Sequence, residues 1–183
     1  MTNIVLRFKP LALGPMAATI RAAALSIALV LGTSLAGAEA HAQGAVTQPI
    51  LSITSAKLIA EAALAECASR GFHTSVAVID RAGNLLVLLR DELAHPVTVE
   101  MAQRKAQTAV IFRASTLEFR DSTANDPSLS AQRDVTGILA LGGGVPIRLA
   151  GEIIGGVASS GSSQTNDDEC ARAGLKKAEE LLE

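Results

Sequence analysis

Aromatic side chains are scarce in this sequence. Its 183 residues include no tryptophan, no tyrosine and only four phenylalanines. Phe72, Phe112 and Phe119 are the three that follow the first forty residues. A hydrophobic core must therefore be built mainly from alanine, valine, isoleucine and leucine. The chain is long enough to bury one such core, and its length favours a single domain.

Metal-binding patterns are also missing. The three histidines, His41, His73 and His95, have no second histidine three or four residues away. The two cysteines, Cys67 and Cys170, form no C-x-x-C pair. Zinc centres usually show one of these spacings, so the sequence gives no local sign of one.

Two catalytic motifs are incomplete in the glycine-rich stretch GGGVPIRLAGEIIGGVASSG at 142–161. A nucleophile elbow, G-x-S-x-G, would need glycine where Val157 precedes Ser159. A phosphate loop would need Lys-Ser/Thr after the glycines at 142–144, and Val145 stands there instead. Glycines that shape the turns of a sheet explain this stretch better than either catalytic motif does.

The first 42 residues differ from the rest. A basic start is followed by the apolar run AAALSIALVL at 22–31 and by Ala40-His41-Ala42, a small-residue cleavage pattern. Because a bilayer span needs about 20 apolar residues, this shorter run predicts a secretory signal peptide over 1–42. The open alternative is a retained N-terminal anchor. Export would make the protein periplasmic or secreted, with no stable membrane insertion after the signal is removed.

The remaining chain is acidic. Removing Arg7, Lys9, Arg21 and Glu39 leaves 13 basic and 17 acidic side chains, a net charge of −4. Nucleic acids and anionic membranes attract basic surfaces, so this charge argues against both as partners.

Residues 43–50 form a short polar lead-in to one domain over 51–183. Helical spacing and capping residues predict helices from Ser52 to Gly71, after Pro96, and from Ser163 or Thr165 onward. Short β-branched runs around tight turns predict two hairpins, 75–80 with 84–90 and 145–149 with 152–159. The polar stretch 120–135 reads as an exposed loop. Hairpins with packed helices predict an α+β domain with an antiparallel sheet.

Four blocks of this sequence resemble the GlcG/HbpS family of haem-binding-type proteins, relatives of the C-terminal domain of PduO-type adenosyltransferases. They are AVIDRAGNLLVLLRDE, VEMAQRKAQTA, GGGVPIRLAGEIIGGVASSG and DDECARAGL. The resemblance covers about residues 51–183. It implies a profilin-like fold with a five-stranded antiparallel sheet, helices on both faces, and assembly as a homo-oligomer.

The resemblance implies binding of haem or a related tetrapyrrole, for storage, sensing or transport. Neutral imidazole ligates iron well, so His95 or His73 is a candidate axial ligand, and His95 is the metal ligand we expect. We place Thr98 and Lys105, on the helix after Pro96, on the same ligand side. The alternative is that both histidines are ordinary surface residues with no role as ligands.

Cys67 lies near the end of the first helix and Cys170 near the start of the last. If these helices pack antiparallel, the two ends meet and a disulfide is possible. Two separate buried thiols are the alternative.

Two other functions stay open. One is an enzyme acting on a small carboxylate metabolite, with Arg104 and Lys105 binding the carboxylate. The other is a non-catalytic partner protein whose hairpin glycines form an oligomer interface.

Overall fold

The computed structural model describes residues 46–182, so the predicted signal peptide over 1–42 lies outside the described residues. The residues from Thr47 onward form one compact unit. Its helices are α2 (Ile53–Ser69), α3 (Val97–Phe112), α4 (Thr116–Asn125), the 3-10 helix η1 (Pro127–Asp134) and α5 (Gln164–Leu182). Its strands are β1 (Ser75–Asp80), β2 (Leu85–Arg90), β3 (Gly144–Leu149) and β4 (Glu152–Ser160).

Both predicted hairpins are present. The strands pair antiparallel in one sheet of order β2-β1-β4-β3. The turn between β3 and β4 is the residue pair Ala150-Gly151, and both residues have positive φ, 48° and 83°. Such two-residue turns match the twist of the strands that they join.

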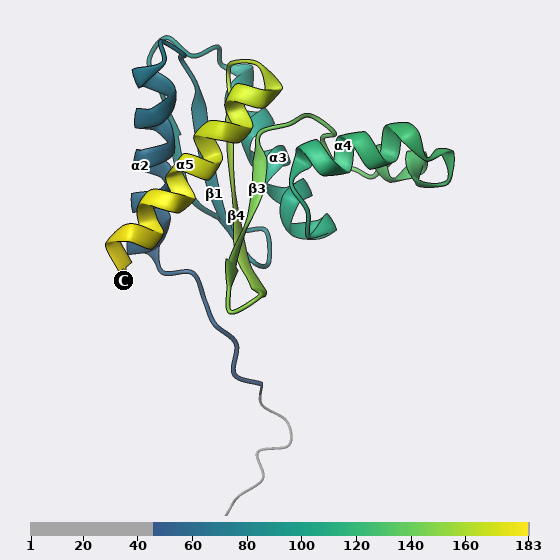
Figure 1. The fold of residues 1–183 in the computed structure, drawn as a ribbon, viewed down its shortest axis with the longest axis horizontal. Helices are drawn as coiled ribbons and strands as arrows, with labels where there is room; N and C mark the ends of the chain where they lie inside the picture. Colours follow the sequence, from purple (N-terminus) through teal and green to yellow (C-terminus); the bar gives the residue numbers. More distant parts are fainter. Residues whose placement is uncertain (1–45, 183) are drawn as a thin grey trace, which may run out of the picture. The chain divides into compact units, whose positions relative to one another are not determined.

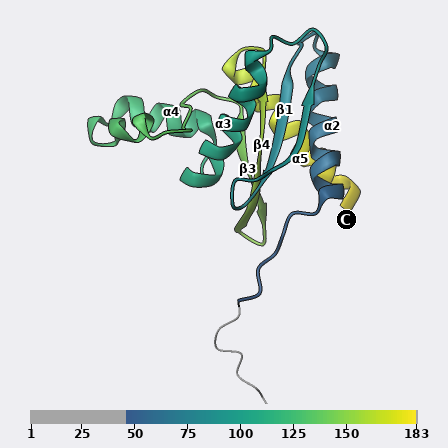
Figure 2. The ribbon, with the colours of Figure 1, turned by 180° about the vertical axis from the view of Figure 1, so that it is seen from behind.

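Helices cover both faces of the sheet. Figures 1 and 2 show α2 and α5 side by side on one face and α3 on the other. Buried aliphatic side chains fill the α2/α5 face, among them Ile59, Val76, Val78 and Val157. Ile79, Ala106 and Ala158 form a smaller cluster beneath α3. The core is aliphatic, as the scarcity of aromatic residues requires.

Two expectations need correction. The sheet has four strands among the described residues, not five. The stretch 120–135 is not an irregular loop, because α4 continues to Asn125 and η1 follows. Most residues of α4 are polar, so its few buried positions do not stand out as an apolar pattern in the sequence. The signal for this helix is its capping box, in which Ser115 and Glu118 satisfy each other's backbone N–H groups.

Glycines bring α3 close to the sheet. A Cβ on Gly144 would lie 2.4 Å from the carbonyl oxygen of Lys105, and one on Gly156 would lie 2.8 Å from that of Ala106. Gly155 is likewise close to another backbone, because a Cβ there would lie 2.4 Å from the carbonyl oxygen of Ile79. A bulge also occurs there, because Ile147 pairs with Gly155 while Arg148 pairs with Ile153.

The two helices on the opposite face are joined covalently. Cys67 of α2 and Cys170 of α5 form a disulfide with a Cα–Cα distance of 5.5 Å. Both cysteines are fully buried. Within residues 46–182, no helix is long and apolar enough to cross a membrane.

Gly144→Ala tests the close approach of α3. The new methyl group meets backbone atoms of Lys105, which cannot move aside cheaply, so we expect a loss of about 1–3 kcal/mol in unfolding free energy. Urea denaturation measures it. The matched control is Gly71→Ala, where no atom lies within 4 Å and only the positive φ opposes the substitution. Equal losses in the two variants would contradict the packing argument.

Candidate functional site

The predicted site residues lie at one end of the sheet. Ser75 begins β1 and pairs with Arg90 at the end of β2 and with Ser160 at the end of β4. The loop that follows β2 leads into α3, and the turn that follows β4 leads into α5. This end of the sheet, with the loop 91–96 and the start of α3, is called the histidine end below.

His73 is held by a carboxylate. Its Nδ1 lies 2.9 Å from Oδ1 of Asp91, and the same oxygen accepts the backbone N–H of Leu93 at 2.8 Å. Asp91 is fixed further because its own N–H donates to the carbonyl of Thr74. An ionised carboxylate only accepts hydrogen bonds, so Nδ1 carries a proton, and in the neutral ring Nε2 has the free lone pair. The His73 side chain is half exposed, so this lone pair is open to a ligand.

Thr98 holds the loop that carries His95. Its hydroxyl donates to the carbonyl of His95 at 2.6 Å and lies 2.7 Å from Oγ of Ser75. Since the Thr98 proton is already used, Ser75 is the donor in the second bond. Thr98 is buried and its hydroxyl bonds to other groups of the protein, whereas His95 is exposed. The His95 ring has no hydrogen-bond partner among the described residues.

Lys105 lies deeper in the protein and is 1% exposed. Its Nζ is 2.9 Å from Oδ2 of Asp167 and 3.1 Å from the carbonyl oxygen of Ser159. The other oxygen of Asp167 accepts from the N–H and the hydroxyl of Ser162. Burial lowers the pKa of Lys105, and the charges of Asp167 and Asp168 oppose that shift.

The structure thus separates the predicted site residues. His73, Thr98 and His95 gather at the histidine end, while Lys105 pairs with Asp167 in the interior. Arg104 donates to the carbonyl of Ile138 and to Glu100, so its guanidinium is also engaged by the protein. Lys105 is therefore not free for the metabolite carboxylate that we considered, and two of the three Arg104 nitrogens are engaged, while its Nε has no partner among the described residues.

Two interaction partners, one of His73 and one of Lys105, could not be identified from the sequence. Asp91 follows a strand in LLVLLRDE, and nothing local links it to His73, which is 18 residues earlier. Asp167 reads as an acid that favours the start of a helix, and its cation is 62 residues away. The pairing of β1 with β2 brings His73 and Asp91 together, and the packing of α3 and α5 against β4 brings Lys105 and Asp167 together, so no spacing rule could have found them.

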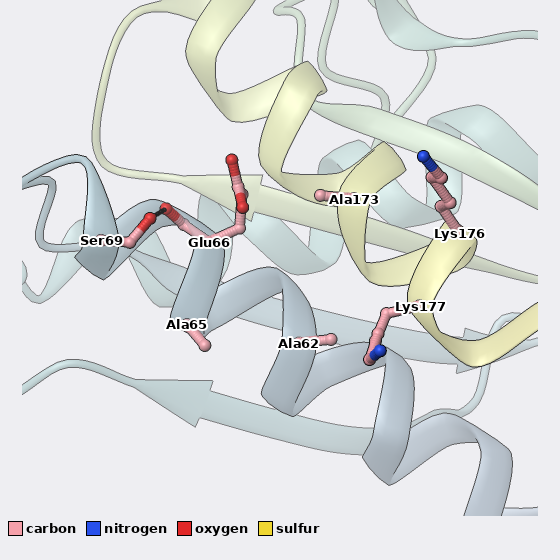
Figure 3. A pocket seen from close by; sticks show the side chains of 7 residues that line it. All are labelled: Ala62, Ala65, Glu66, Ser69, Ala173, Lys176 and Lys177. Atoms are coloured by element: carbon pink, nitrogen blue, oxygen red, sulfur yellow. Dashed lines mark hydrogen bonds between the residues drawn. The ribbon is translucent and has the colours of Figure 1, made fainter. Parts of the chain in front are cut away.

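A wide groove between α2 and α5 lies apart from these residues. Its volume is about 590 Å³, and Figure 3 shows that small side chains from both helices line it together with Glu66, Lys176 and Lys177. Glu66 at its edge is paired with Arg70. No histidine lines this groove, so it does not extend the histidine end.

The Lys105–Asp167 pair generates a stability prediction. Lys105→Met leaves the Asp167 carboxylate buried without its cation, and Asp167→Asn leaves a buried cation. We expect each single change to cost about 3–5 kcal/mol of unfolding free energy.

A double-mutant cycle measured by urea denaturation checks this. The double variant Lys105→Met/Asp167→Asn should lose clearly less than the sum of the two single losses, since neither charge is then left alone. Additive losses would mean that the two side chains are not coupled.

Comparison with known proteins gives the family. Residues 51–176, more than half of the chain, match the family described as Haem degrading protein HbpS-like. Protein GlcG of Escherichia coli K12 is 32% identical over 114 residues, which cover 62% of this chain and 84% of GlcG.

Two solved structures resemble the fold. A double mutant of HbpS from Streptomyces reticuli has a TM-score of 0.70 and 36% identity, covering 77% of this chain and 95% of that one. A PduOC–haem complex has a TM-score of 0.65 and 26% identity, covering 70% and 95%. With the family match and the shared α+β architecture, this chain belongs to the HbpS-like family.

Proposed function

We propose that this protein binds haem at the histidine end, with His73 as the axial ligand. The observation that carries the proposal is the His73–Asp91 pair. A histidine whose Nδ1–H is held by a carboxylate has its tautomer and ring orientation fixed, and its Nε2 becomes a better metal ligand.

The composition of the site favours haem over a bare metal ion. No group of three or more His, Cys, Asp or Glu able to hold a metal is present in residues 46–182. A haem iron already has four equatorial nitrogens and needs only an axial ligand from the protein. When bound, haem would supply redox or ligand-binding chemistry at its iron. The protein's own part is to present one oriented imidazole.

The surroundings of His73 suit the apolar part of a porphyrin. Phe72 is half-buried beside it, and Leu93 and Val97 are 69% and 49% exposed on the neighbouring loop and helix start. Covering these apolar side chains would favour binding. Their exposure also fits a ligand that lies on the surface rather than in a closed pocket.

His95, the ligand expected from sequence, is the weaker candidate. Its ring has no partner to orient it among the described residues, whereas that of His73 has Asp91. Thr98 supports the site indirectly, because its hydroxyl holds the carbonyl of His95. Lys105 supports the fold rather than a propionate.

Relatives agree with this proposal. The family is described as haem degrading, and one of the structures with the same fold is a haem complex of PduOC. The residues of the histidine end explain how haem would be bound. Storage, sensing and transport would each depend on this binding.

We also propose that the protein is exported to the periplasm or secreted and acts as a homo-oligomer. The pattern over residues 1–42 supports export, and so does the Cys67–Cys170 disulfide, because disulfides persist in oxidising compartments.

Titration with haemin, followed by absorbance, tests the proposal. The wild-type protein should give a saturable Soret shift at one haem per chain. His73→Ala should lose this shift, and Asp91→Asn should weaken binding by about 10–100-fold because the imidazole loses its orienting partner.

His95→Ala is the matched control, since it removes the other exposed histidine of the histidine end. Its binding should equal that of the wild type. Loss of the Soret shift in His95→Ala with retention in His73→Ala would refute the assignment. An unsaturable change equal in all variants would refute haem binding itself.

A further inference from the structure

Two neighbouring cavities lie along α5, outside the histidine end. Their volumes are about 370 and 430 Å³. Arg148, Leu175 and Glu179 line both of them, so the two cavities are adjacent. The pair of cavities lies between α5 and the edge strand β3 and is called the α5–β3 groove below.

The larger cavity is aliphatic. The side chains come from the start of α2, the β3–β4 hairpin and α5, and include Leu51, Ile59, Ile147, Ile154 and Ala178. Leu149 at its rim is 54% exposed. Such a surface gains free energy when an apolar chain covers it. No histidine, cysteine or methionine lines either cavity, so the groove offers none of these axial ligands to a haem iron.

The smaller cavity is rich in arginine. Arg113, Arg148 and Arg172 line it together with Glu118 and Glu179. Arg172 is paired with Asp168. The Arg148 guanidinium donates to the carbonyls of Arg113 and Gly151, and not to a carboxylate.

Two of these arginine charges therefore have no carboxylate bonded to them. Arg113 has no hydrogen-bond or ion-pair partner for its guanidinium among the described residues. Glu118 is not hydrogen-bonded to Arg148, because one oxygen of its carboxylate accepts the N–H and the hydroxyl of Ser115, although its negative charge still acts on Arg148. Those bonds also keep the pKa of Glu118 below its usual range. An arginine that is not already bonded to a carboxylate is a common receptor for the carboxylate of a ligand.

From this arrangement we infer that the α5–β3 groove binds a linear aliphatic monocarboxylate. The hydrocarbon chain lies in the aliphatic cavity, and the carboxylate reaches Arg148 and Arg113 in the neighbouring one. Binding sites of this kind are mostly apolar with a few placed polar groups, and both cavities fall within the usual size range. This site is separate from the proposed haem site.

Isothermal titration with dodecanoate, below its micelle concentration, tests the inference. We expect one saturable site per chain. Dodecyltrimethylammonium, with the same chain and a positive head group, should not bind. Arg148→Gln should weaken dodecanoate binding about ten-fold, the size expected for one charged hydrogen bond.

Ser55→Phe places a ring at the mouth of the aliphatic cavity and should abolish binding, while Ser52 still caps α2 through the backbone N–H of residue 55. Arg81→Gln is the matched control, because Arg81 is an exposed arginine that lines neither cavity. Its affinity should equal that of the wild type.

Saturation with haemin should leave dodecanoate binding unchanged. Displacement by haemin would overturn the separate site. Equal binding of the cationic detergent, or equal affinity in Arg148→Gln, would overturn the role of the carboxylate. Failure of dodecanoate to bind would overturn the inference without touching the haem proposal, which rests on His73.

Discussion

One buried ion pair organises the domain. The Lys105 ammonium joins α3 to the Ser159 carbonyl of β4 and to Asp167 of α5, so one side chain holds two helices and the sheet. An ammonium can be buried only with its charge paired and its protons bonded. Close contact between α3 and the sheet is therefore required, and Gly144 provides it because any side chain there would collide with Lys105. On the opposite face, the Cys67–Cys170 disulfide fixes α5 against α2.

The sequence predicts the parts of this fold that depend on local patterns. The two hairpins follow from β-branched runs around short turns. The sequence left open whether the two cysteines form a disulfide or stay as separate thiols, and the structure shows the disulfide. Helix α4 is missed because its polar surface outweighs three buried positions, Thr116, Phe119 and Thr123. The count of five strands came with the family resemblance, and four are present in the described part of the chain.

The candidate site is predicted less completely, for a physical reason. His73, His95 and Thr98 can be picked out singly, but the roles of the candidate residues depend on partners that strand pairing and helix packing bring in. Asp91 turns His73 into an oriented imidazole, and Asp167 turns Lys105 from an apparent surface cation into an internal support. Both acids lie far from their partners in sequence. The family match places the protein among haem-related relatives, and our proposal of His73 over His95 rests on the hydrogen bond between His73 and Asp91.

The most direct test of this division of roles is the position of iron in crystals of the haemin complex, located by anomalous diffraction at the iron absorption edge. We predict one iron peak bonded to Nε2 of His73, with Asp91 still on Nδ1 and Lys105 still paired with Asp167. An iron peak at His95 or in the α5–β3 groove would contradict the assignment. Movement of Lys105 from Asp167 to a haem propionate would contradict its structural role.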